Sequence, residues 1–504
     1  MQTPDAIDVQ QLLAACRHHL RAGTENIEIF CELGQRLRSA GREQEARRCY
    51  KRSVELLLAA ARRGDADLAL HIEQGIYLHF VRPVETEEHY YRCFSDWRDD
   101  MARLGRRLRV PANYQAADPA QVAFILMGGQ RLGHSEVLLR YLTAYLREGE
   151  RRVTPVIYTL HECTREFTEM CARAGVRLVS LVDERPDLRN AGTGRRLHGL
   201  RERLASDRIA CAVWVSVPTG VSFAFSLGLA PVQILWALRF HPVAGPYIDG
   251  YLTYGSPGER ERRFGKQSWR VVPTPLAIET PRIDAEHARR ERARFSEAFL
   301  FGTVAREDKI RSPAFLAAVA AILKACPEAG YVWTGRDRPP EIEGFFHAQG
   351  VAGRCHFAGW VDAPLYAGIL DVFLETFPLG CGVTGYQALG AGTPLLSYLE
   401  ENTVFGMQYW HTLKAGGVAS RPVDLSAFPI LCAATPEDYV ALACRLASDR
   451  AFRASVGERG RTYFEREKDL GVSHANAFFR AIEEVICEKL GPVAAAAGSA
   501  ARPA

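Results

Sequence analysis

The sequence predicts an α/β protein in which a helical module precedes two successive, doubly wound α/β domains. Three observations support this. An early segment has the spacing of a helical repeat, strand-like apolar runs then alternate with helical stretches, and the alternation restarts once after a proline-containing break. We therefore expect four parts: a helical module over 1–110, α/β domains over 120–278 and 296–490, and a disordered tail over 491–504.

The composition is that of an ordinary globular chain. Of its 504 residues, 47% are hydrophobic and 24% are charged. The formal net charge of +4 is small, and the arginines are scattered instead of forming a stripe. We therefore expect no nucleic acid as a partner.

The cysteines and the N-terminus favour a cytoplasmic protein. None of the thirteen cysteines forms a C-x-x-C pair, which favours buried reduced thiols over a metal or redox site. The first residues lack the basic and apolar regions of a signal peptide. No apolar run reaches the roughly 18 residues of a membrane span, so we expect no integral membrane segment.

The helical module contains one good repeat, over residues 26–59. One face of its first helix carries Phe30, Leu33, Gly34 and Leu37, a turn follows at Gly41, and the second helix presents Ala46, Tyr50 and Ser53. Small residues where two helices touch and larger ones where they wedge are typical of a tetratricopeptide repeat. Two interpretations remain open: a generic helical cap, or a surface for a partner or protein acceptor.

The two α/β series have the order expected of the GT-B layout, in which two Rossmann-like domains are followed by closing helices. The first series starts with the buried-strand run 121–129 and the second with 298–305. The second continues with the runs 329–335, 354–360, 371–377 and 393–399. In such folds ligands bind in a cleft at the carboxyl ends of the strands.

A glycine-rich loop after one strand of the second domain is the strongest candidate site. Within residues 371–398, Gly380, Gly382 and Gly385 follow the strand, and a helix opens near Thr384. The N–H groups that begin a helix favour an anion, so a nucleotide diphosphate fits this chemistry. The alternative is a tight turn whose glycines serve packing.

Two basic residues follow the first strand of the same domain. Arg306 and Lys309 lie at its carboxyl end. A lysine there can stabilise the charge that develops on a diphosphate leaving group. A surface lysine is the alternative for this position alone.

The first domain supplies the acceptor-side candidates. His134 begins its first helix and has the chemistry of a general base or of a sugar-holding group; a local contact is the alternative. His241 and Gly245 lie in a loop between two strand-like runs, followed by Asp249, an acid/base candidate or a turn residue.

The sequence lacks the common motifs of other chemistries. It has no GxxxxGK[ST] loop, no H-E-x-x-H and no G-x-S-x-G, and no D-x-D pair occurs in its two α/β series. We therefore expect no metal requirement and no cofactor beyond a nucleotide-sugar donor.

Four of these segments, within residues 120–410, resemble one family. They are GQRLGHSE, APVQILW…HPVAG…IDGYLTYGSP, FGTVAREDKIRSPAFLAAVAAILKACPEA and DVFLETFPLGCGVTGYQALGAGTP. They are similar to segments of the family that contains O-GlcNAc transferase and the bacterial cytoplasmic N-glucosyltransferases that modify adhesins. A tetratricopeptide module ahead of the catalytic part also suits O-GlcNAc transferase.

The resemblance implies roles for individual residues. It implies that Lys309, Thr384 and Gly385 contact the donor diphosphate and that His134 is the cleft histidine. Two positions depart from the family: Gln387 replaces the aspartate that holds the donor ribose, and Ala363 stands near the place of a base-stacking histidine. An amide still hydrogen-bonds hydroxyl groups, but without charge.

The resulting hypothesis is an inverting transfer of a hexose from a nucleotide diphosphate sugar, UDP-glucose or UDP-GlcNAc, to a protein side chain. One alternative is a transferase for a lipid-linked or surface polysaccharide, which predicts an exposed basic amphipathic patch that docks at the membrane surface, with residues 101–110 as the candidate. The other is a scaffold whose transferase domains have degenerated, which Gln387 favours. The sugar, the base and the acceptor residue stay open.

Overall fold

The structure is a computed structural model of the chain. It describes residues 9–39, 42–81, 87–110, 116–215, 219–238, 243–253, 260–264, 266–272, 280–400, 403, 405, 430–469 and 471–491. The chain divides into two compact units. The first comprises Met1–Gly255, Glu259–Thr274 and Val472–Ala504, and the second comprises Ser256–Gly258 and Pro275–Gly471. The predicted disordered tail from residue 492 onward and the predicted turn at Gly41 lie outside the described residues.

The first unit begins with helices. They are α1 (Val9–Arg21), α2 (Ile27–Ser39), α3 (Glu43–Arg63), α4 (Ala66–Ile76), a π-helical turn (Tyr77–Val81), α5 (Glu87–Phe94) and α6 (Arg98–Leu108). The two helices expected within 26–59 are α2 and α3, which pack together and bury Phe30, Leu37 and Ala46. A Cβ on Gly34 would lie 2.3 Å from the ring of Phe80, so only glycine fits where the helices touch.

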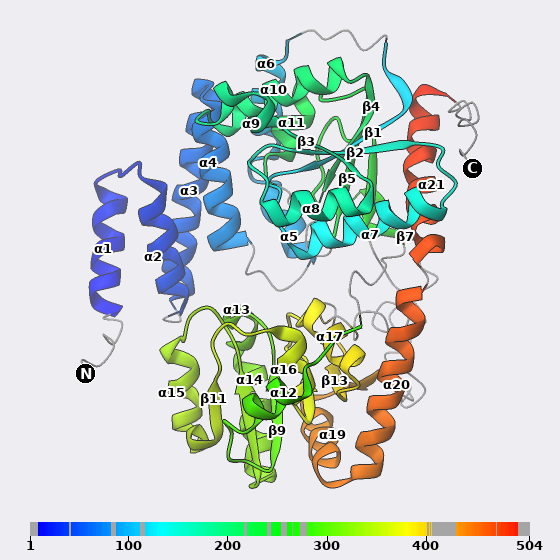
Figure 1. Cartoon of the computed structure of the whole chain (residues 1–504). Coiled ribbons are helices and arrows are strands. Elements are labelled where there is room, and N and C mark those ends of the chain that lie inside the picture. Colours follow the sequence, from blue (N-terminus) through cyan, green and yellow to red (C-terminus); the bar gives the residue numbers. More distant parts are fainter. Residues whose placement is uncertain are drawn as a thin grey trace, which may run out of the picture. The chain divides into compact units, whose positions relative to one another are not determined.

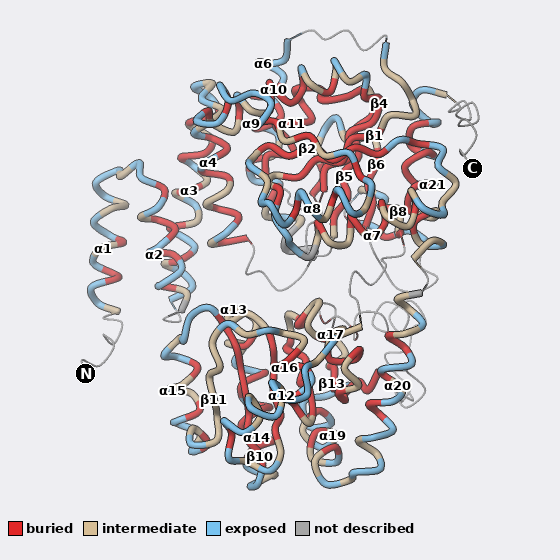
Figure 2. The backbone as a smooth tube through the Cα atoms, in the orientation of Figure 1, coloured by how far each residue is buried: buried red, intermediate tan, exposed pale blue. Residues whose placement is uncertain are grey.

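The first sheet follows the helices and has the strand order β3-β2-β1-β4-β5-β6-β8-β7, with only β7 antiparallel. The strands are β1 (Asp118–Leu126), β2 (Thr154–Thr159), β3 (Arg177–Ser180), β4 (Ile209–Val215), β5 (Val232–Ala237), β6 (Gly250–Thr253), β7 (Glu261–Phe264) and β8 (Gln267–Val271). Every residue of β4 and β5 is buried, as expected for central parallel strands covered on both faces (Figure 2).

The helices of the first α/β region are α7 (Gly133–Glu148), α8 (Arg165–Ala174), α9 (Leu181–Glu184), a 3₁₀ turn (Pro186–Leu188), α10 (Thr193–Ser206) and α11 (Val221–Leu227). The helical module is bonded to two of them. Asp67 of α4 accepts the N–H of Gly194 at the start of α10 at 2.7 Å, and α6 packs along α11. The module and the first sheet therefore form one unit.

A buried carboxylate makes the central link between the module and this sheet. Glu73 of α4 accepts the indole N–H of Trp97 at 3.0 Å and the backbone N–H of Gly220, the N-cap of α11, at 2.9 Å. Burial raises the pKa of Glu73 to about 7, and these two hydrogen bonds oppose the rise.

The second unit contains a fully parallel sheet with the order β11-β10-β9-β12-β13-β14. Figure 1 labels its strands β9, β11 and β13. Its strands are β9 (Phe299–Thr303), β10 (Ala329–Trp333), β11 (Cys355–Phe357), β12 (Val372–Leu374), β13 (Leu395–Tyr398) and β14 (Leu431–Ala433). Counted within each unit, six strands of both sheets have the order 3-2-1-4-5-6 of a Rossmann fold. The predicted α/β class with two doubly wound domains behind a helical module is confirmed.

The helices of the second unit are α12 (Ala285–Arg292), α13 (Glu307–Ile310), α14 (Pro313–Ala325), α15 (Pro340–Ala348), a 3₁₀ turn (Ala352–Arg354), α16 (Ala363–Ile369), α17 (Val383–Ala391), α19 (Pro436–Ser448) and α20 (Arg450–Asp469). None of the described helices is long and apolar enough to cross a bilayer.

The last helix is α21 (Gly471–Leu490). The sequence analysis included these residues in the second α/β domain, over 296–490, whereas the whole helix except its first residue belongs to the first unit. Its aromatic residues stack on α7, with ring centroids 4.3 Å apart for Tyr141 and Phe478 and 3.8 Å apart for Tyr145 and Phe479. The sequence showed its apolar face but not which sheet that face covers.

We expect Glu73→Ala to destabilise the first unit. The substitution leaves the buried donors of Trp97 and Gly220 without their acceptor, at about 1–3 kcal/mol for each. Urea unfolding followed by circular dichroism measures the loss. Glu55→Ala, which removes an exposed carboxylate from α3, is the matched control. Equal stability of the two variants would contradict the linking role of Glu73.

Candidate functional site

The candidate site of the second unit lies where its strand order reverses. The adjacent strands β9 and β12 are followed by loops that lead into α13 and α17 (Figure 1). In doubly wound folds this switch point, at the carboxyl ends of the strands, is where ligands bind.

Two hydrogen bonds connect these two regions, and each region supplies the donor of one bond and the acceptor of the other. The ammonium of Lys309, on α13, donates to the carbonyl of Gly380 at 2.6 Å. The hydroxyl of Thr384, on α17, donates to the carbonyl of Val304. The predicted lysine and the predicted glycine loop are therefore brought to one place.

Gly382 has a conformation that requires glycine. Its φ is 78° and its ψ is −135°, a region that residues with a Cβ essentially avoid. It is the N-cap of α17, and a Cβ placed on it would lie 3.7 Å from the Lys309 nitrogen. The backbone thus passes close to a cation where the first N–H groups of α17 have no partner within the helix.

Gly385 serves packing, one of the two interpretations left open for the loop glycines. A Cβ there would lie 2.7 Å from the sulfur of Cys381 and 3.1 Å from the ring of Phe405. Its N–H also donates to the carbonyl of Gly382 at 3.2 Å. The contact with a diphosphate that the resemblance implies for Gly385 stays a prediction.

Gln387 lies three residues after Thr384, close to one turn further along α17. Among the residues that the structure describes, its Oε1 is buried and has no hydrogen-bond partner. A buried amide oxygen without a partner costs free energy, which a hydroxyl donor of a ligand would recover.

Arg306 is the N-cap of α13, and acidic neighbours surround it. Its guanidinium pairs with the carboxylate of Asp308 at 3.3 Å. Glu307 accepts the backbone N–H of Arg336 at 3.1 Å and so ties α13 to the loop after β10. The positive charge of Arg306 is thus partly neutralised within α13 itself.

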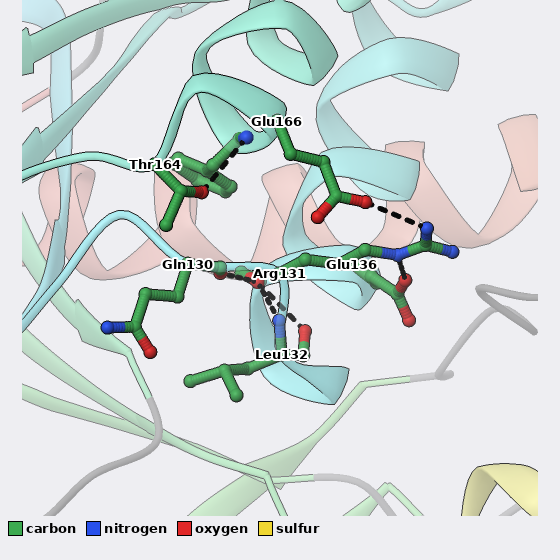
Figure 3. Close-up of polar contacts among 8 residues, drawn as sticks. Gln130, Arg131, Leu132, Glu136, Thr164 and Glu166 are labelled. Carbon is green, nitrogen blue, oxygen red and sulfur yellow. Dashed lines mark hydrogen bonds and ion pairs between the residues drawn. The ribbon is translucent and has the colours of Figure 1, made fainter. Parts of the chain in front are cut away.

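In the first unit, the loop after β1 is built around the start of α7 (Figure 3). The Ser135 hydroxyl accepts the N–H of Leu132 at 2.9 Å and lies 2.7 Å from the carbonyl oxygen of Gln130. Arg131 pairs with Glu136 and, at 3.0 Å, with Glu166 of α8. These contacts fix the first turn of α7.

His134 lies in that fixed turn. Burial lowers the pKa of His134 to about 4, because a charged imidazole loses hydration there. The side chain is therefore a neutral imidazole near pH 7, able to accept a proton or a hydrogen bond.

The other acceptor-side candidates are His241, Gly245 and Asp249. His241 lies outside the described residues. The N–H and C=O of Gly245 both bond to the Tyr251 hydroxyl, at 3.3 and 3.1 Å, so this glycine anchors a loop. Asp249 accepts the N–H of Gln233 at 2.9 Å and pairs with Lys489 at 2.5 Å, which favours the structural interpretation.

The structure therefore brings together Arg306, Lys309, Gly382, Thr384 and Gln387, all in the second unit, whereas His134 and Gly245 belong to the first. Within the described parts of the chain, no group of three or more His, Cys, Asp and Glu residues is placed to hold a metal ion.

The sequence analysis missed two residues at the same edge of the second sheet. Arg336 follows β10, and the exposed Trp360 follows β11. Arg336 comes just after the Gly that ends the run 329–335, and Trp360 is itself the last residue of the run 354–360, so the ends of these runs were the available signal. The sequence analysis interpreted both runs only as strands.

Solved structures with the same fold include glycosyltransferases. A mutant of the O-GlcNAc transferase of Thermobaculum terrenum matches 97% of this chain and 99% of its own, at 15% identity and a TM-score of 0.56. HepE of Anabaena, in complex with UDP and glucose, matches 72% of this chain and 100% of its own, at 11% identity and a TM-score of 0.50. At these identities the likeness shows a shared fold, here GT-B.

No family model matches the sequence. No curated protein matches it either.

We expect Gly385→Ala to destabilise the second unit by about 1–3 kcal/mol, because the added methyl overpacks the start of α17. Gly344→Ala is the matched control. It also lies within a helix, nothing comes within 4 Å of its added Cβ, and it should stabilise by about 0.5–1 kcal/mol. Thermal unfolding measures both, and equal shifts would show that Gly385 has no packing role.

We expect the His134 imidazole to stay neutral from roughly pH 8 down to pH 5, because burial holds its pKa well below the ordinary value of about 6.5. Nuclear magnetic resonance of a histidine-labelled sample measures this, with His134→Gln identifying the resonance. A midpoint near pH 6.5 would contradict the burial of this side chain.

Proposed function

We propose that this protein is a glycosyltransferase that moves a hexose from a nucleotide diphosphate sugar to a protein side chain with inversion. The observation that carries the proposal is the placement of Lys309 against the glycine loop that opens α17. A cation, a closely approaching backbone and the start of a helix suit a diphosphate.

The reaction has one bond exchange. A nucleophilic atom of the acceptor side chain attacks C1 of the sugar from the face opposite the leaving group. The bond between C1 and the β-phosphate oxygen breaks, and the nucleoside diphosphate leaves with its electron pair. Lys309 stabilises the charge that grows on this oxygen, and the N–H groups at the start of α17 act with it.

The remaining donor contacts are assigned to residues around Lys309. Thr384 and Gly382 shape the diphosphate loop, with Gly385 beneath it, and Arg306 adds positive charge at the start of α13. Gln387 accepts a hydroxyl hydrogen of the ribose through its buried oxygen. Because Lys309 supplies the positive charge, we propose that no metal ion is required.

On the acceptor side, His134 is the residue that takes the proton of the attacking group. Its lowered pKa keeps it neutral and ready to accept, although it makes it a weak base. His241 and Gly245 shape the acceptor side. The neighbour structures support the donor class, since one is an O-GlcNAc transferase and the other binds UDP and glucose.

The helical module favours a protein acceptor. We propose that α2 and α3 form a tetratricopeptide-like repeat and that the module recognises a protein in the cytoplasm. The rival interpretation, a lipid-linked or surface polysaccharide as acceptor, predicts an exposed basic amphipathic helix that docks at a membrane surface, and residues 101–110 were the candidate for it. In α6, however, Met101 and Leu104 are buried, and a Cβ on Gly105 would lie 2.5 Å from the carbonyl of Phe223 in α11. That apolar face is already used for packing.

We expect Lys309→Ala to lower the transfer rate at saturating donor at least ~10-fold, since such electrostatic contacts exceed about 1.4 kcal/mol in the transition state. Incorporation of labelled hexose from UDP-glucose and UDP-GlcNAc into protein measures the rate. Lys324→Ala, an exposed lysine of the same unit, is the control and should leave the rate unchanged.

A smaller decrease of the transfer rate in Lys309→Ala would contradict the proposed role of Lys309 in stabilising the leaving diphosphate. Absence of both transfer and donor hydrolysis in the wild type would instead support the alternative of a degenerate scaffold.

A further inference from the structure

The helical module brings two cysteine sulfurs into contact. Cys16 of α1 and Cys49 of α3 are 33 residues apart in the sequence, and their Sγ atoms lie 3.6 Å apart, within hydrogen-bond distance for thiols. Both side chains are buried, and both are free thiols. A C-x-x-C motif cannot reveal such a pair, because helix packing and not spacing along the chain brings the sulfurs together.

Close packing of the first three helices positions this pair. Helix α1 packs on α2 and α3, and α2 packs along α3. A Cβ placed on Gly34 of α2 would lie 3.3 Å from the Cβ of Cys49, so the backbone of α2 passes close to this cysteine. Cys49 therefore lies in a tightly packed part of the module, and Cys16 reaches it from α1.

The surroundings of Cys16 favour its thiolate. The hydrogen bond with Cys49 lowers the pKa of Cys16, and burial opposes this effect. The positive charges of Arg48 and Arg17 lower the pKa further, whereas Glu45 raises it. The same hydrogen bond, together with burial, raises the pKa of Cys49. One sulfur of the pair thus ionises more readily than an ordinary thiol, and the other keeps its proton.

This division of roles suits the oxidation of a thiol pair. The thiolate is the form that attacks an oxidant, and a neighbouring thiol converts the first product into a disulfide. The sulfurs need only close from 3.6 Å to the length of a disulfide bond, about 2.05 Å. Because both side chains are buried, the oxidant has to be a small molecule such as a peroxide.

We propose that Cys16 and Cys49 form a site of reversible oxidation, at which hydrogen peroxide converts the two thiols into a disulfide that joins α1 to α3. This site lies outside the proposed donor and acceptor sites and does not depend on the proposed function.

The reaction has two steps. The Cys16 thiolate attacks one oxygen of the peroxide, the O–O bond breaks and hydroxide leaves, so that Cys16 becomes a sulfenic acid. The Cys49 sulfur then attacks the Cys16 sulfur, the S–O bond breaks, and the hydroxyl leaves as water with the proton of Cys49. In total the two thiols lose two electrons and two protons, and the peroxide becomes two water molecules. Exchange with an external thiol reduces the disulfide again.

Peptide mapping of the full-length protein after treatment with hydrogen peroxide tests the site. Trypsin places Cys16, Cys31 and Cys49 in separate peptides, which end at Arg17, Arg36 and Lys51. We expect the folded wild type, treated and then alkylated, to yield a disulfide between the peptides that end at Arg17 and Lys51. Dithiothreitol should remove this disulfide.

Three variants serve as controls for the mapping. Cys31→Ala removes another buried thiol of the same module and should keep the disulfide. Cys16→Ala and Cys49→Ala should each abolish it. A wild type that forms no disulfide, forms it only after unfolding in urea, or links Cys31 instead would overturn the proposal and leave a pair of packed thiols. This test uses the wild type alone, so it does not depend on how well the variants fold.

Hydrogen exchange measures what the disulfide does to the module. A bond between α1 and α3 closes a loop around α2 and restricts the open states of α1. In the oxidised wild type we expect the amides of α1 to exchange at least ~10-fold more slowly than in the reduced protein. Amides of α14, in the second unit, should exchange equally in both forms. Equal exchange of α1 in the two forms would contradict the proposed joining of α1 to α3.

Discussion

The pair of opposed hydrogen bonds between the exits of β9 and β12 is the constraint on which the candidate site depends. One bond runs from Lys309 to the carbonyl of Gly380, and the other runs from Thr384 to the carbonyl of Val304. Each bond uses a side chain of one loop and a backbone carbonyl of the other. The two bonds hold the lysine beside the start of α17, which is the preorganised placement that the proposed charge stabilisation requires.

Contacts between a side chain of one element and the backbone of another also explain why the helical module belongs to the first unit. Glu73 and Asp67, both on α4, accept backbone N–H groups at the starts of α11 and α10. The first turn of a helix lacks internal acceptors, so an acidic side chain from another element completes it and interacts favourably with its dipole. The cost is a buried carboxyl whose pKa rises to about 7.

The sequence predicted those features that follow from local patterns. Apolar runs predicted the strands, and the residues after two of these runs placed Lys309 and Gly382 at one edge of the second sheet. Local patterns of this kind do not show which elements pack against each other. Nothing local distinguishes Gly385, which packs on Cys381, from Gly382, which has the unusual backbone. The apolar face of α21 likewise does not reveal that Tyr141 and Tyr145 of α7 cover it.

Ala363, which stands where the resembled family has a histidine, begins a helix of the second unit. The resemblance places a base-stacking histidine near this position, whereas the interpretation as a degenerate scaffold rested on Gln387. In the structure Ala363 is the first residue of α16, which Asp362 caps, and the exposed ring of Trp360 stands three residues earlier. Gln387 keeps a buried oxygen available to a hydroxyl group. Under the proposed function, Gln387 would hold the donor without a charge, so this residue by itself does not favour a scaffold over an enzyme.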